Sequence, residues 1–122
     1  MLNHEDFEAL VVEALQTLPA EIMARLENVA LTVEDWPSPT QLAEARVPRG
    51  STLFGLYQGI PLTHRTTAYG MVAPDRITLF RGPLLRAFPH LDALAEQVRR
   101  TVVHEIGHYF GMNEAQIAAL GY

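Results

Sequence analysis

The sequence predicts an α+β fold, in which a small, mostly antiparallel sheet packs on an N-terminal helix and on a long helix near the other end. Three observations lead to this prediction: helical spacing of apolar residues over 7–18, short β-like runs between 29 and 81, and a second helical pattern over 90–110. A helix followed by several strands and then by helices is typical of α+β proteins.

The first element is an amphipathic helix. Apolar residues recur at intervals of three and four from Phe7 to Leu18, as on one buried helix face. Asn3 precedes two acidic residues and is a suitable N-cap. Pro19 interrupts the pattern, and a further helical turn is expected over 22–26.

The middle of the chain predicts strands. Apolar residues alternate with smaller or polar ones over 29–33, as in a half-buried strand. Residues 36–50 contain three prolines and a glycine, which indicates a surface connection with at most a short helix after Thr40. Turn residues separate the remaining β-like runs, which suggests antiparallel strands with short returns. These runs lie at 53–57, 66–72 and 76–81.

The last third of the chain predicts two helices. One broad apolar face runs from about 90 to 110, and Gly111 then stands where a C-terminal glycine commonly ends a helix. Asn113, followed three residues later by Gln116, has the spacing of a capping box. A short final helix is therefore expected over 114–120.

Length and composition exclude several classes of protein. With 122 residues and 48% hydrophobic content, the chain is expected to form one domain over 1–122. Its net charge of −5 argues against binding to nucleic acid or to an anionic membrane surface. The chain has no cysteine, so disulfides are excluded and a metal site must use His, Asp or Glu.

The first residues and the hydropathy of the chain indicate where in the cell the protein is expected. The first residues carry acids where a signal peptide needs positive charge, and no apolar run approaches the ~18 residues of a membrane span. We therefore expect a cytoplasmic protein, monomeric and without a membrane partner.

The strongest chemical signal is HEIGH at 104–108. On a helix, residues i and i+4 lie on the same side, so His104 and His108 can direct both imidazoles at one ion. Glu105 lies beside them, placed to deprotonate a metal-bound water rather than to join the pair as a ligand. This pattern indicates a zinc hydrolase in which Glu105 takes a proton and returns it to the leaving amine.

A catalytic zinc site normally needs a third protein ligand. Gly111 allows a sharp change of direction after the helix. Glu114 stands ten residues after His104, where proteases with the HExxHxxGxxH pattern carry their third histidine, and is the predicted ligand. The helix dipole also favours an acid in a first turn without any metal, and other Asp or Glu residues stay open as rivals.

Other histidines and tyrosines have simpler explanations. Surface or hydrogen-bonding roles are expected for His4, His64 and His90. A phenol could meet a developing oxyanion, but packing on the sheet is the expected role of Tyr57, Tyr69 and Tyr109.

Three segments together resemble the small bacterial zincin-like metallopeptidases, a family also described as minimal zincins. The segments are LFGLYQGIPLTHR (53–65), PDRITLFRGPLLR (74–86) and VRRTVVHEIGHYFGMNEAQIAALGY (98–122). They follow one another in the family's order over most of the C-terminal two-thirds of the chain. The resemblance implies a zincin-like fold with one Zn²⁺ as cofactor, in which the active-site helix lies beneath a small twisted sheet.

The resemblance also bears on the substrate and on the third ligand. In related zincins a peptide pairs with the edge strand above the metal, which implies that the strand at 66–72 or the one at 76–81 does so here. The family's acidic pair after the glycine falls on Asn113 and Glu114. The amide at 113 departs from that pattern and favours Glu114.

We therefore expect a zinc metallopeptidase acting on a peptide or protein substrate. The alternative is a non-catalytic metal-binding or protein-interaction domain, in which the ion fixes the long helix to the C-terminal turn. In a third hypothesis there is no metal, and residues 104–114 are only helix polarity and capping.

Overall fold

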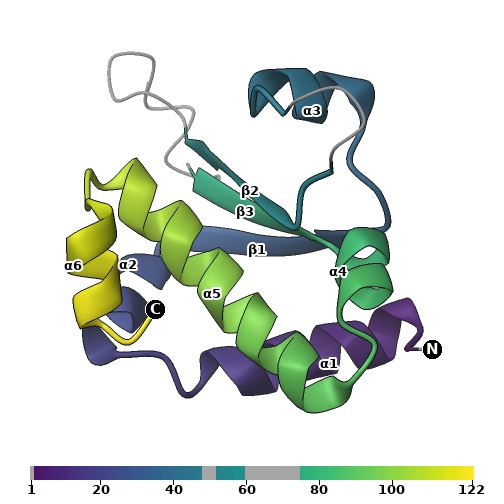
Figure 1. The fold of residues 1–122 in the computed structure, drawn as a ribbon, viewed down its shortest axis with the longest axis horizontal. Coiled ribbons are helices and arrows are strands. Elements are labelled where there is room, and N and C mark those ends of the chain that lie inside the picture. Colours follow the sequence, from purple (N-terminus) through teal and green to yellow (C-terminus); the bar gives the residue numbers. More distant parts are fainter. Residues whose placement is uncertain (1, 48–51, 60–74) are drawn as a thin grey trace.

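The computed structural model describes residues 2–47, 52–59 and 75–122 (Figure 1). Within these ranges the helices are α1 (His4–Leu15), α2 (Ala20–Leu26), α3 (Pro39–Glu44), α4 (Arg81–Ala87), α5 (Leu91–Tyr109) and α6 (Glu114–Ala119). The strands are β1 (Val29–Glu34), β2 (Gly55–Gly59) and β3 (Asp75–Phe80). The predicted strand at 66–72 lies outside the described residues.

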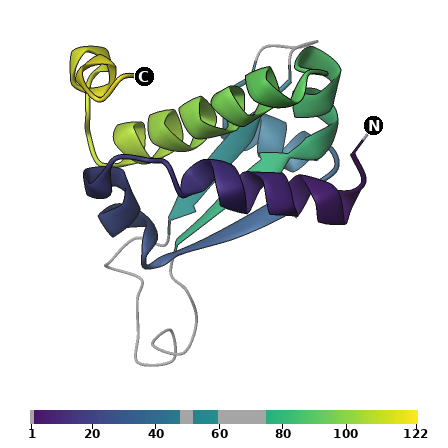
Figure 2. The same cartoon turned by 90° about the horizontal axis from the view of Figure 1, so that it is seen from below.

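The α+β prediction is confirmed. Two helices, α1 and α5, lie side by side against one face of the sheet (Figure 2). The core between these layers is built from the apolar face predicted for α1, including Phe7 and Val11, and from that of α5, including Val98 and Val102. Burial of these faces is what holds the long helix in place under the sheet.

The described sheet has the order β1-β3-β2. β2 and β3 are antiparallel, as expected for neighbouring runs, whereas β1 and β3 are parallel. The described part of the sheet is therefore mixed rather than mostly antiparallel. The reason is topological: the chain leaves β1 through α3, runs back along β2, and returns as β3 between β1 and β2.

The helix α4 was not predicted. The pattern at 76–81 predicts a strand to its end, but the strand stops at Phe80 and α4 begins at Arg81. Proline is tolerated in the first turn of a helix, which accommodates Pro83. The N–H of Gly82 donates to the carbonyl of Asp35 (2.8 Å), so a tertiary contact supports this short helix.

Local capping signals were predicted well. The Asn3 side chain accepts from the N–H of Asp6 at the start of α1. At α6, Asn113 and Gln116 form both hydrogen bonds of the capping box. These bonds involve residues three apart, which is why sequence spacing reveals them.

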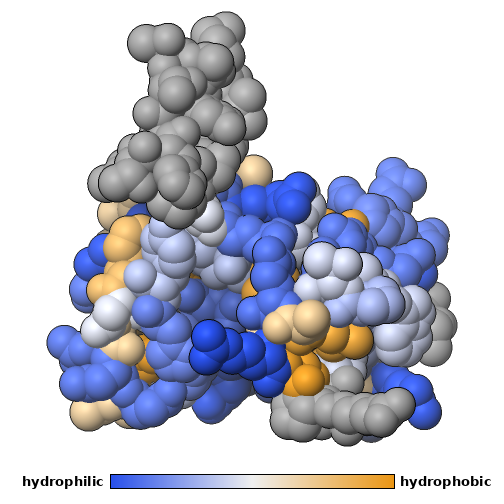
Figure 3. Space-filling view, turned by 90° about the horizontal axis from the view of Figure 1, so that it is seen from above, coloured by the Kyte–Doolittle hydropathy of each residue, from blue (hydrophilic) through white to orange (hydrophobic). Residues whose placement is uncertain are grey.

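One face of the molecule is largely polar. Hydrophilic residues predominate among the described residues visible in Figure 3, and the apolar ones form small, separate areas. None of the helices in the described part of the chain combines the length and the hydropathy that a membrane crossing requires.

Close packing of β2 on α5 depends on glycine. A Cβ at Gly55 would lie 2.7 Å from Cγ2 of Thr101 and 3.2 Å from the main-chain oxygen of Thr78. We expect Gly55→Ala to lower the free energy of unfolding by about 1–3 kcal/mol, measured by urea denaturation.

Gly107→Ala is the control for this prediction. Its Cβ would lie 2.9 Å from Cδ1 of the buried Ile117, but alanine gains about 1 kcal/mol of helix propensity over glycine, which offsets part of that clash. We expect a smaller loss here, and equal losses for the two variants would contradict the importance of the β2–α5 contact.

Candidate metal centre

The last turns of α5 carry the two histidines of the HExxH motif. His104 and His108 lie one turn apart on the same side of the helix, with ring centroids 5.8 Å from each other. His104 is partly buried and His108 is exposed. Because α5 is anchored by its buried face, both imidazoles are presented by a rigid element.

The turn after α5 brings a third side chain to them. Gly111 has φ +79°, its N–H donates to the carbonyl of His108, and the N–H of Met112 donates to that of Gly107. This is the Schellman motif, in which glycine takes the left-handed position that other residues rarely adopt. It reverses the chain so that α6 begins beside the histidines.

Glu114, the first residue of α6, lies against both histidines. Its Oε1 is 2.8 Å from Nε2 of His108, and its Oε2 is 3.8 Å from Nδ1 of His104. One potential ligand atom from each of the three residues lies within 4.8 Å of the other two. Tetrahedral ligands at ~2.0–2.1 Å from zinc are roughly 3.4 Å apart, so these atoms need only small shifts to share one ion.

The chemistry of this donor set fits zinc. Two imidazoles and one carboxylate are the ligands of known catalytic zinc sites, which keep a fourth position for water or substrate. Glu114 is 72% exposed, so the carboxylate is not held there by burial. The three residues predicted as ligands are thus brought together by the fold, while their role as ligands remains a prediction.

Glu105 points to the sheet rather than to Glu114. Its Oε1 accepts a hydrogen bond from the main-chain N–H of Tyr57 in β2 (2.9 Å). Burial raises the pKa of the Glu105 carboxyl, while the Tyr57 bond and the neighbouring His108 and His104 act to lower it. A carboxyl with a raised pKa is a stronger base than an ordinary one, as general-base chemistry near neutral pH requires.

The raised pKa has a consequence for stability in the metal-free protein. A carboxyl whose pKa is raised in the fold destabilises the fold once it ionises, and this cost is absent below its ordinary value of 4.5. In the presence of chelator, we therefore expect Glu105→Gln to resist urea better than the wild type near neutral pH. The difference should vanish below about pH 4, and a difference that grows on acidification would contradict this.

Aromatic side chains support β2 next to Glu105. The rings of Tyr57 and Tyr109 stack with centroids 4.1 Å apart, and the Tyr57 hydroxyl donates to Asp75 (3.0 Å). Both tyrosines thus have the packing role expected for them, and Tyr69 lies outside the described residues. A side chain at Gly59 would collide with the Tyr109 ring, so glycine is needed there for this approach.

Two partners of the site were missed by sequence reasoning. The N–H of Tyr57 bonds to Glu105, and the main-chain oxygen of Tyr122 lies 3.3 Å from Nε2 of His104. Both contacts use main-chain atoms, which leave no residue-type signal in a sequence.

His4 bonds to the carbonyl of Val33 on the surface, as expected, and His64 lies outside the described residues.

A cavity of about 230 Å³ lies beside His104 and Glu105. Polar side chains on its α5 wall are Gln97, Arg100 and Thr101, and the opposite wall is formed by 52–55. A larger cavity of about 470 Å³ lies between α1 and the first half of α5, away from all four residues of the candidate site. The smaller cavity is therefore the one that adjoins the candidate site.

Comparison with known proteins agrees with this picture. Residues 26–122 match the family of zincin-like metallopeptidases. A solved structure, described as a conserved hypothetical protein from Thermus thermophilus, is similar in fold with a TM-score of 0.59. It shares 20% sequence identity, and the alignment covers 88% of this chain and 94% of that one. No curated protein matches the chain.

Proposed function

Since the chain belongs to the zincin-like metallopeptidase family, we propose that it is a zinc-dependent peptidase with one ion held by His104, His108 and Glu114. The observation that supports this proposal most strongly is that these three side chains, from two helices, lie close together. Family membership supports the reaction class, and the donor set supports the metal. The substrate is a peptide or a protein.

Glu105 is proposed as the general base. When bound, zinc would supply Lewis acidity that activates water and polarises the scissile carbonyl. Because Oε1 of Glu105 accepts from the Tyr57 N–H, its Oε2 is the atom that takes the proton and then delivers it to the leaving amine. The Tyr57 bond also fixes the orientation of the carboxylate, so that little reorganisation is needed.

A substrate was expected to pair with the strand at 66–72 or with the one at 76–81. The strand at 76–81 corresponds to β3, which is paired on both sides and cannot add a peptide, so that alternative was wrong. The strand at 66–72 lies outside the described residues. Phe80 donates to the carbonyl of Phe54 across the β2–β3 pair, and alternation then directs the main-chain groups of Gly55, Tyr57 and Gly59 away from β3. The Tyr57 N–H bonds to Glu105, so β2 lies directly beside the proposed general base.

The alternative is a non-catalytic metal site that fixes α6 to α5. It is favoured by the length of α6, six residues, since so short a helix gains much from a tether at its first residue. This alternative requires the same ligands but no turnover, so metal analysis and hydrolysis must be measured together.

We expect protein purified without a histidine tag to bind about one equivalent of zinc and to cleave members of a peptide library. Chelation should remove hydrolysis and lower the melting temperature, and zinc should restore both. Binding without cleavage would support the structural alternative. Failure to bind zinc at micromolar concentration would overturn both forms of the proposal.

A further inference from the structure

The small cavity beside the candidate metal centre carries a positive charge. Arg100 lines it together with His104 and Glu105, and the other lining residues are uncharged. Since Glu105 is assigned to proton transfer, Arg100 is the charged side chain of the described lining that has no part in the proposed chemistry. By contrast, the larger cavity between α1 and α5 is lined by three acidic residues and one arginine, in keeping with the net charge of −5.

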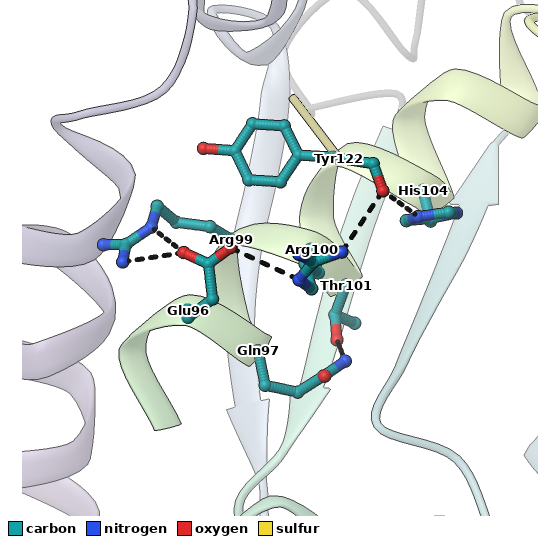
Figure 4. A network of polar contacts seen from close by, with 7 residues as sticks. All are labelled: Glu96, Gln97, Arg99, Arg100, Thr101, His104 and Tyr122. Atoms are coloured by element: carbon teal, nitrogen blue, oxygen red, sulfur yellow. Dashed lines mark hydrogen bonds and ion pairs between the residues drawn. The ribbon is translucent and has the colours of Figure 1, made fainter. Parts of the chain in front are cut away.

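The charge of Arg100 is only partly neutralised by its neighbours. Its Nε lies 3.3 Å from Oε1 of Glu96, one helical turn earlier. The other oxygen of that carboxylate accepts two hydrogen bonds from Arg99, at 3.0 and 3.2 Å, so Glu96 lies between two arginines (Figure 4). One carboxylate cannot balance two guanidinium groups, and these three side chains therefore carry a net positive charge.

Hydrogen-bond donors accompany this charge. The side chain of Arg100 is 45% exposed, and its Nη1 lies 3.3 Å from the main-chain oxygen of Tyr122. Its Nη2 has no hydrogen-bond or ion-pair partner among the residues that the structure describes. Nε2 of Gln97 donates to Oγ1 of Thr101 (3.1 Å), which leaves the hydrogen of that hydroxyl for another acceptor (Figure 4). A carboxylate is the acceptor that suits such a set of donors best, since its hydrogen bonds with arginine are charge-assisted.

We propose that this cavity is a subsite for an acidic side chain of the substrate, bound by Arg100. The inference rests on the proposed peptidase function and names the substrate class: peptides with glutamate or aspartate next to the cleaved bond. The volume of about 230 Å³ is below the ~300–1,000 Å³ typical of pockets that take a whole ligand, so it suits a single side chain.

The first experiment measures the preference of the zinc-loaded wild type. Cleavage sites in a random peptide library with amidated C-termini are identified by mass spectrometry. The sequence that is cleaved best is then synthesised with glutamate, glutamine or lysine at the preferred flanking position. We expect kcat/KM to be about 10-fold higher for the glutamate peptide than for the glutamine peptide and lowest for lysine. The preference should weaken as salt is raised, because Arg100 is partly exposed.

The second experiment compares Arg100→Gln with Arg99→Gln. Both variants lose a contact with Glu96, but Arg99 does not line the small cavity. Each variant is judged by the ratio of kcat/KM for the glutamate and glutamine peptides, which does not depend on the fraction of folded or zinc-loaded protein. We expect this ratio to fall to within about 2-fold of unity in Arg100→Gln and to stay at the wild-type value in Arg99→Gln. Arg100→Glu should reverse the preference and favour lysine over glutamate.

Binding without turnover gives a second readout. Glu105→Gln is expected to bind the glutamate and glutamine peptides without cleaving them, so calorimetry can measure both dissociation constants. We expect the glutamate peptide to bind about 10-fold more tightly in Glu105→Gln and equally tightly in the double variant with Arg100→Gln.

The outcomes are distinct from those of the proposed function. If the zinc-loaded wild type cleaves no peptide, the peptidase proposal fails and this inference fails with it. If it cleaves peptides without a preference for acidic residues, or keeps that preference in Arg100→Gln, the subsite alone is overturned. A preference that depends on a free C-terminal carboxylate would also overturn it, because the cavity would then bind the end of the substrate chain instead of a side chain.

Discussion

Replacing Glu105 with glutamine is expected to abolish detectable peptide hydrolysis while zinc binding and fold are kept. The amide has nearly the shape of the carboxylate, and its oxygen can still accept the hydrogen bond from the Tyr57 N–H. It cannot take a proton from water at neutral pH. We expect the rate of hydrolysis to fall by about 10²–10⁴-fold, the usual contribution of a general base.

The experiment measures hydrolysis and zinc content on the same preparation. Glu13→Gln is the matched control, because Glu13 is exposed on α1 and takes no part in the site. That variant should retain full activity. Zinc-dependent turnover at the wild-type rate in Glu105→Gln would remove Glu105 from the mechanism, and loss of zinc from this variant would indicate that Glu105 acts as a ligand instead.

The second large effect is expected on zinc affinity when Glu114 is replaced with glutamine. This change removes the negative charge that lies 2.8 Å from His108 but keeps the length of the side chain. The capping box of α6 uses Asn113 and Gln116 and is left intact. We expect zinc affinity to fall by at least about 100-fold, beyond the range typical of outer partners, and the stabilisation by zinc to be lost with it.

Asn113→Asp controls for the neighbouring position. Aspartate caps a helix as well as asparagine does, and it restores the acid that the related family usually carries there. If Glu114 is the ligand, this variant should bind zinc within about 3-fold of the wild type. Wild-type affinity in Glu114→Gln would instead direct attention to one of the other acids, and the dissociation constants of the two variants decide between these cases.

Several features of the protein were predictable because they depend on neighbours in sequence. The N-cap at Asn3, the end of α5 at Gly111 and the capping box at Asn113 all involve residues within one helical turn. The pairing of His104 with His108 follows in the same way from the pitch of a helix. Such signals survive in the sequence because no other part of the chain is needed to satisfy them.

Features set by distant contacts were predicted poorly or not at all. The helix α4 was missed because its start, RGP, is typical of a turn, and because its support comes from Asp35. The central place of β3 could not be read from its residues, since the alternation of a strand does not reveal which neighbours it has. For that reason the strand at 76–81 was wrongly offered as one of two possible peptide-binding edges.

By itself, the sequence determined the α+β class, the helix carrying HEIGH and the candidacy of Glu114 as third ligand. Only the tertiary structure decided that the main chain of β2 holds Glu105 and that the Tyr122 oxygen lies next to His104. The physical reason is that the chemistry of each side chain and its spacing along a helix follow directly from the order of the residues. The main-chain N–H and C=O groups that orient those side chains are the same at every residue type except proline, so only their position in space distinguishes them.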